Sequence, residues 1–124
     1  MQQPTVVHLM RHGQVHNPEG VLYGRLPGFG LSELGHDMAA RLAGYWKGAP
    51  LTHLRCSPLQ RARETLAPTA DLFPQLDVVI DERVIEAANA FEGKVFGANN
   101  KALRDMRMIR HVLNPLRPSW GEPY

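Results

Sequence analysis

TVVHLMRHG, residues Thr5–Gly13, is a short apolar and β-branched run that ends in an arginine, a histidine and a glycine. This pattern is typical of a buried strand that leads into a loop. In open parallel sheets, ligands bind beyond the carboxyl ends of the strands. The sequence therefore predicts a strand over residues 5–10 and a candidate site directly after it.

The segments that follow alternate between helical and strand patterns. Apolar residues recur at three- and four-residue spacing in two of them, and β-branched or apolar runs separate these helical patterns. We expect a helix capped by Ser32 that stops near Gly48, a strand over 52–56, a helix from Ser57-Pro58 to about Phe73, and a strand over 76–80. This order predicts an α/β fold with a mostly parallel sheet.

The remainder of the chain is expected to be less regular. Residues 81–100 show no sustained period, residues 101–113 have helical spacing, and residues 114–124 are rich in proline and glycine. No repeat, low-complexity tract or linker divides the chain. We therefore expect one domain over residues 1–124.

Composition excludes several classes of protein. The 124 residues include one cysteine, Cys56, so an internal disulfide framework and zinc sites built on cysteine pairs are excluded. No apolar run is long enough to span a membrane, and the formal net charge of +2 is too small for a general polyanion binder. These features predict a soluble, cytoplasmic protein without a nucleic-acid or membrane partner.

The basic residues nevertheless favour an anionic ligand. Eleven of the fourteen are arginines, whose guanidinium groups suit bidentate binding of phosphate or carboxylate. Arg61 falls in the first turns of a predicted helix, where a positive charge opposes the helix dipole unless an anion is bound there. At the end of the first strand, His12 is a candidate nucleophile toward phosphorus, and Arg11 would neutralise the phosphate oxygens.

Four ordered motifs resemble those of the histidine phosphatase superfamily, the phosphoglycerate mutase-like enzymes. They are LMRHG at Leu9–Gly13, LSELG at Leu31–Gly35, CSPLQRARET at Cys56–Thr65 and DERVIEAANAFEGK at Asp81–Lys94. The resemblance implies a three-layer α/β/α domain whose sheet is mostly parallel.

The same resemblance implies roles for individual residues. His12 would accept the phosphoryl group, Arg11 and Arg61 would hold the phosphate, and Glu86 would protonate the leaving alkoxide, with Glu92 as its rival. Neither a metal nor another cofactor is expected. Contacts to a small phosphorylated substrate would come from residues at and after the end of the first strand, namely Gly13, Asn17, Tyr23, Gly24 and Arg25.

One part of the family pattern is not found in this chain. The family places a second catalytic histidine after a fourth strand, and His111 lies in a helical pattern with no β run before it. We therefore expect a domain that lacks its C-terminal part. An open sheet would expose strand edges that favour pairing with another chain, for example in a homodimer.

These observations leave several functions open. The first hypothesis is hydrolysis of a small phosphomonoester through a phosphohistidine. A phosphoglycerate mutase-type isomerase is the nearest alternative, and a non-catalytic fragment that binds phosphate ligands is another. A nucleic-acid binder, suggested by the arginines at 104, 107 and 110, ranks last.

Overall fold

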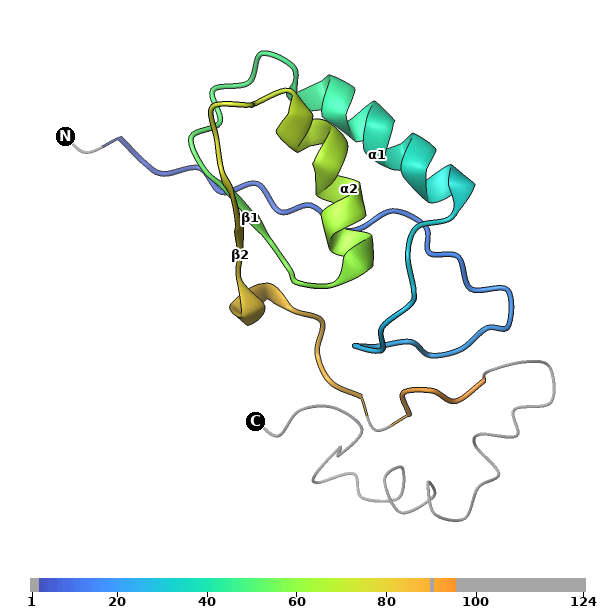
Figure 1. Ribbon diagram of the computed structural model, residues 1–124. Helices are drawn as coiled ribbons and strands as arrows, with labels where there is room; N and C mark the ends of the chain where they lie inside the picture. Colours follow the sequence, from blue (N-terminus) through green and yellow to red (C-terminus); the bar gives the residue numbers. More distant parts are fainter. Residues whose placement is uncertain (1–2, 90, 96–124) are drawn as a thin grey trace.

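The computed structural model of the chain describes residues 3–89 and 91–95. Helices and strands alternate along it, as the sequence predicts (Figure 1). In chain order they are α1 (Glu33–Trp46), β1 (Leu54–Cys56), α2 (Gln60–Asp71), β2 (Val78–Ile80) and the short 3-10 helix η1 (Glu82–Val84). The predicted α/β fold class is confirmed.

The two strands form a parallel sheet, which confirms the predicted strand direction. Leu54 pairs with Val78, and Cys56 pairs with Ile80. Because parallel neighbours need a crossover connection, α2 lies between them in the chain. The backbone N–H of Asp81 donates to the carbonyl of Cys56 at 2.8 Å and extends the pairing by one bond.

Helix α1 begins and ends close to where the sequence predicts. The Ser32 hydroxyl accepts the backbone N–H of Gly35 at 3.0 Å, so it satisfies one of the donors that a helix leaves unpaired at its start. After Trp46 the chain turns at Gly48, whose φ is +78°, a conformation that favours glycine.

Helix α2 begins two residues later than predicted, with Gln60 rather than Pro58 as its first residue. The Ser57 hydroxyl accepts the N–H of Leu59 at 3.3 Å within the preceding turn, so it does not cap the helix. Leu59 is the N-cap residue and provides no side-chain hydrogen bond. On the inner face of α2, Leu66 packs with Leu54, Cys56 and Phe73 in the main apolar core.

The strand predicted over residues 5–10 is wrong. This segment is neither a helix nor a strand, and Val7 and Leu9 are 74% and 94% exposed. Its apolar pattern suits a buried strand, but a strand also needs a neighbour for its backbone hydrogen bonds, and the described residues provide none. It runs as an irregular segment past the two strands (Figure 1).

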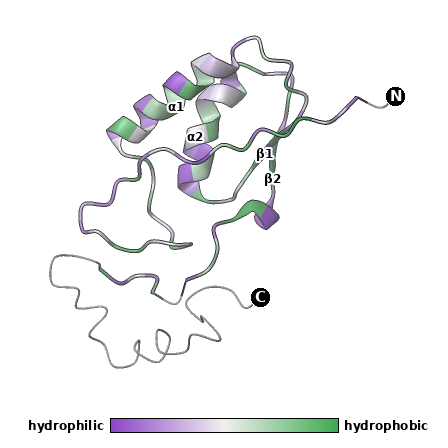
Figure 2. Cartoon of the chain, turned by 180° about the vertical axis from the view of Figure 1, so that it is seen from behind, coloured by the Kyte–Doolittle hydropathy of each residue, from purple (hydrophilic) through white to green (hydrophobic). Residues whose placement is uncertain are grey.

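The sheet is covered unevenly. Figure 2 shows the apolar character of β2, yet Val79 and Ile80 are each 46% exposed. Both helices pack against each other, and α2 also contacts β1. The helix predicted over 101–113, which includes His111, and residues 114–124 lie outside the described residues.

No helix among residues 3–89 and 91–95 is long and apolar enough to cross a membrane.

Candidate active site

Gly13 lies at the centre of a buried polar network. Its backbone N–H donates to the Thr65 hydroxyl at 3.0 Å, and that hydroxyl donates to the Arg61 carbonyl at 2.7 Å. A Cβ atom at Gly13 would lie 2.6 Å from the Gly35 carbonyl oxygen, which is closer than Cβ atoms approach other heavy atoms in proteins. The glycine is therefore required by the close approach of the chain to the start of α1. We call Gly13, Gly35, Arg61 and Thr65 the cradle.

Arg61 is 1% exposed, in the first turn of α2. One guanidinium nitrogen donates to the Gly24 carbonyl, and the guanidinium carbon lies 4.6 Å from the centre of the Tyr23 ring. Its Nε is buried without a hydrogen-bond partner, and no carboxylate of the described residues lies within 4.0 Å of the side chain. Because a buried charge is costly unless it is paired, this arginine favours an anionic ligand.

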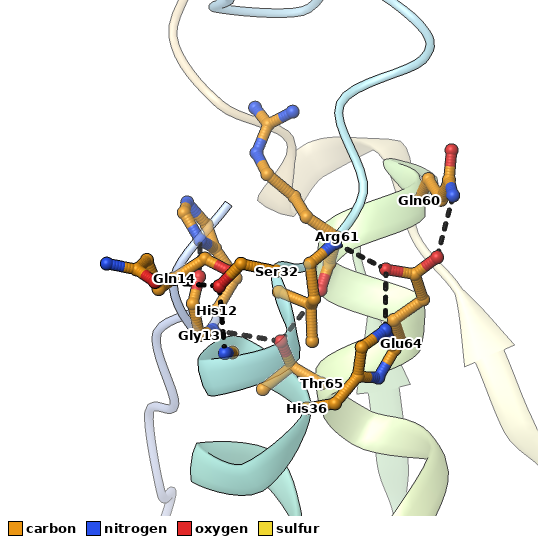
Figure 3. A network of polar contacts seen from close by, with 11 residues as sticks. His12, Gly13, Gln14, Ser32, His36, Gln60, Arg61, Glu64 and Thr65 are labelled. Atoms are coloured by element: carbon orange, nitrogen blue, oxygen red, sulfur yellow. Dashed lines mark hydrogen bonds and ion pairs between the residues drawn. The ribbon is translucent and has the colours of Figure 1, made fainter. Parts of the chain in front are cut away.

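His12 is half-buried, and its ring has a fixed orientation. The Nδ1 atom lies 2.8 Å from the Gly13 carbonyl oxygen. Since a carbonyl only accepts, Nδ1 must carry the proton, which leaves the Nε2 lone pair available in the neutral ring. Tyr23 lies edge-on to the His12 ring at 6.4 Å between centroids. In Figure 3 the His12 and Arg61 side chains extend to the same side of the Gly13–Thr65 bond.

The other phosphate ligand predicted from the sequence is less constrained. Arg11 is exposed, and no hydrogen bond or ion pair joins its side chain to a described residue. The structure therefore brings His12, Gly13 and Arg61 together, while the phosphate-binding role of Arg11 stays a prediction.

The two candidate acids differ in their surroundings. Glu86 is exposed beyond η1, and its backbone carbonyl accepts Arg25 Nε at 2.5 Å. Glu92 Oε1 accepts the backbone N–H of Arg25 at 3.0 Å and that of Asn89 at 3.4 Å. The Glu92 carboxylate thus fixes the loop that contains Gly24 and Arg25. The role of Glu86 as the acid stays a prediction.

The predicted substrate contacts in the loop fall into two groups. The Asn17 amide group donates to the Val21 carbonyl at 2.8 Å and accepts the Val21 N–H at 3.0 Å, so it closes the turn between them. Tyr23 and Gly24 instead contact Arg61 directly. Tyr23 also stacks on Phe29 at 5.3 Å. Tyr23 and Gly24 therefore help to hold the Arg61 guanidinium group in place.

Sequence reasoning missed two residues that build the cradle. Thr65 is 2% exposed, and its hydroxyl donates to the Arg61 carbonyl four residues earlier. Threonines in helices often form this hydrogen bond, so the four-residue spacing from Arg61 could have indicated it. Gly35 is needed because a Cβ there would overlap the Gln14 carbonyl. The motif LSELG contains this glycine, but only the packing shows its reason.

Glu64 was also missed, and it ties the loop to α2. Its carboxylate accepts the Leu31 N–H and the Gln60 amide, each at 2.6 Å. Partial burial acts to raise the pKa of Glu64, but these two hydrogen bonds and the nearby His36 hold that pKa below its ordinary value. The carboxylate is therefore a fixed anion at the start of α1.

The family profile of the histidine phosphatase superfamily (branch 1) matches residues 7–124. The chain belongs to the histidine phosphatase superfamily. That match covers the cradle, His12 and both candidate acids.

Relatives of known sequence agree with this membership. The uncharacterized protein Rv0525 of Mycobacterium tuberculosis is 49% identical over 124 residues, which are 100% of this chain and 61% of that protein. The Schizosaccharomyces pombe protein named Probable phosphatase C1687.21 is 32% identical, over 94% of this chain and 59% of its own length. The chain thus spans about three fifths of these relatives.

Solved structures show the same fold. Bacillus stearothermophilus YhfR has a TM-score of 0.68 and 27% identity, over 91% of this chain and 56% of its own. The mycobacterial glucosyl-3-phosphoglycerate phosphatase Rv2419c has a TM-score of 0.65 and 24% identity, over 90% and 53%. The described elements therefore form part of a histidine phosphatase fold.

Proposed function

We propose that this protein hydrolyses a small phosphomonoester through a phosphohistidine on His12. The observation that carries the proposal is Arg61, a guanidinium that is 1% exposed, has an unpartnered Nε and extends to the same side as His12. A phosphate dianion would pair with this buried charge. Membership in the superfamily and the phosphatase names among its relatives support the same reaction.

The reaction divides into two transfers. In the first, His12 Nε2 attacks phosphorus, the bond from phosphorus to the ester oxygen breaks, and the leaving alkoxide takes a proton from Glu86. In the second, water gives a proton to the Glu86 carboxylate and attacks phosphorus, the bond from phosphorus to His12 Nε2 breaks, and inorganic phosphate, neutral His12 and protonated Glu86 result. Charge spreads over the phosphoryl oxygens during each transfer, so Arg61 and Arg11 stabilise the transition state.

The Nδ1–H bond to the Gly13 carbonyl supports the role of His12 in this scheme. It presents the opposite nitrogen to the phosphate and stabilises the positive charge that the ring gains when Nε2 becomes phosphorylated. The Gly13–Thr65–Arg61 bonds fix the backbone that carries both functional side chains. Such positioning is a major part of the rate enhancement in phosphoryl transfer.

The experiment is phosphate release from a generic aryl phosphate by the 124-residue chain. His12→Ala should abolish turnover, and Arg61→Gln should reduce it by about 10²–10³ because a buried electrostatic group is lost. His53→Ala, an exposed histidine that contacts Thr52, is the matched control and should keep full activity. Turnover that survives in His12→Ala would disprove the proposal.

A further inference from the structure

Residues 91–95, orange in Figure 1, pair with the long loop that precedes α1. The Gly93 N–H donates to the Leu22 carbonyl at 2.9 Å, and the Leu22 N–H donates to the Lys94 carbonyl at the same distance. Glu92 is next to this pairing, and its side chain is half-buried. The pairing therefore places one carboxylate against the loop that contacts the buried guanidinium.

One peptide group of this loop lies between that carboxylate and the guanidinium. Its N–H belongs to Arg25 and donates to Glu92 Oε1 at 3.0 Å. Its carbonyl belongs to Gly24 and accepts a guanidinium nitrogen of Arg61. Because hydrogen bonds in a chain polarise one another, each of the two strengthens the other. Glu92 is thus linked to the charge of Arg61 through a single peptide, although no direct ion pair joins the two side chains.

The surroundings of this peptide are fitted to the Glu92 side chain. A Cβ atom at Gly24 would overlap the Glu92 carboxylate, and the φ of Gly24 is +42°, a conformation that favours glycine. Glu92 Oε1 also accepts the N–H of Asn89 at 3.4 Å, and the Glu92 N–H donates to the Asn89 carbonyl at 3.1 Å. These bonds and the glycine fix the carboxylate oxygen in front of the Arg25 N–H.

The orientation of Arg61 depends on the same peptide. The side chain is 1% exposed, and its guanidinium carbon also lies 4.6 Å from the centre of the Tyr23 ring. Its Nε has no partner among the described residues and remains for a phosphate oxygen. A guanidinium is planar, so a fixed hydrogen bond at one nitrogen sets the direction of the other N–H groups.

We propose that Glu92 is a positioning residue: it holds the peptide between Gly24 and Arg25, and this peptide orients the Arg61 guanidinium toward the phosphate. The inference rests on the proposed function and adds to it a residue that acts on phosphate binding without touching the substrate. Glu92 Oε1 accepts two backbone N–H groups, so this oxygen is committed to the loop rather than to a leaving group. Acid catalysis is thereby left to Glu86.

Calorimetric binding of inorganic phosphate to four forms of the 124-residue chain tests this role. Glu92→Ala removes the acceptor of the Arg25 N–H and should weaken phosphate binding about tenfold, the size of one lost hydrogen bond. Glu92→Gln keeps an acceptor oxygen and should bind within about threefold of the wild type. Glu19→Ala, which removes an exposed carboxylate of the same loop, should match the wild type. Wild-type affinity in Glu92→Ala, or equal losses in both Glu92 variants, would overturn the proposal.

Turnover of a generic aryl phosphate separates positioning from acid catalysis. Glu92→Gln should keep at least about a third of the wild-type kcat, whereas loss of a general acid lowers kcat by about 10²–10⁴. A loss of that larger size would overturn the positioning role. If the wild type binds phosphate without turnover, the proposed function fails, and the binding comparison still decides the role of Glu92. If the wild type does not bind phosphate, both proposals fail.

Should Glu92→Ala fail to fold, the nearly isosteric Glu92→Gln provides a second measurement by nuclear magnetic resonance. The Nε–H signal of Arg61 should shift in Glu92→Gln, because the charge next to the linking peptide is removed. The same signal should stay in place in Glu19→Ala. An Arg61 signal that is unchanged in Glu92→Gln would overturn the proposal.

Discussion

The cradle and strand β2 differ sharply in how completely the described residues bury them. Arg61 and Thr65 are 1% and 2% exposed. The Thr65 hydroxyl joins the Gly13 N–H to the Arg61 carbonyl through two hydrogen bonds. Val79 of β2 and Leu9 of the N-terminal segment are 46% and 94% exposed, although both are apolar. Residues between 13 and 65 thus close the polar site, while β2 and the N-terminal segment are left exposed. The difference predicts that substitutions cost far more in the cradle than on β2.

The largest contrast should come from two glycines on the same helix. Gly35→Ala should lower the free energy of unfolding by about 3 kcal/mol, the upper end of the usual cost of overpacking, because its Cβ would overlap the Gln14 carbonyl. Gly44→Ala should instead raise it by about 0.5–1 kcal/mol, because its Cβ meets nothing within 4 Å and alanine favours a helix. Urea unfolding of both variants measures this, and equal losses would contradict the account.

The hydroxyl of Thr65 should give the next largest effect. Thr65→Val keeps the shape but leaves the buried Gly13 N–H without its acceptor, and should cost about 1–3 kcal/mol. Thr65→Ser retains the hydroxyl and should recover a large part of that loss. Thermal unfolding of the pair distinguishes the hydrogen bond from packing, and a serine variant no better than valine would show that the bond is unimportant.

Acid should weaken the contact between the loop and α2. The folded-state pKa of Glu64 is lowered, so its contribution is complete above the ordinary pKa of 4.5 and is lost as pH falls through the lowered value. Glu64→Gln should be less stable than the wild type near pH 7, and the gap should narrow toward pH 3. Urea unfolding across this range checks it, and two parallel curves would contradict the prediction.

The smallest effect is expected on the open sheet. Val79→Thr should change the free energy of unfolding by less than about 0.5 kcal/mol, because Val79 is 46% exposed and lies outside the buried core. Leu66→Ala in the buried core is the contrast and should cost about 2–5 kcal/mol. A cost at Val79 that depends on protein concentration would mean that a second chain covers this face in solution.

The sequence predicted local structure well where one segment determines it. The Ser32 cap, the stop near Gly48 and the α/β alternation depend on neighbours in the chain, and all are found. The strand over 5–10 was wrong because a strand needs a partner, which the pattern of one segment does not provide.

Prediction of the site was limited for the same reason. The motifs indicated His12, Gly13 and Arg61, and the structure places these three together. Thr65 and Glu64 form hydrogen bonds to residues 52 and 33 positions away, and Gly35 packs against Gln14, and spacing along the chain shows none of these contacts. The choice between Glu86 and Glu92 as the acid stays a prediction.

The central claim is that the cradle is a ready-made phosphate site, and nuclear magnetic resonance tests it most directly. Inorganic phosphate is titrated into the isotope-labelled chain while the backbone amide of Gly13 and the Nε–H of Arg61 are followed. The account predicts that both signals shift and saturate together with one dissociation constant. Shifts confined to exposed arginines such as Arg41 and Arg83, without saturation, would contradict it.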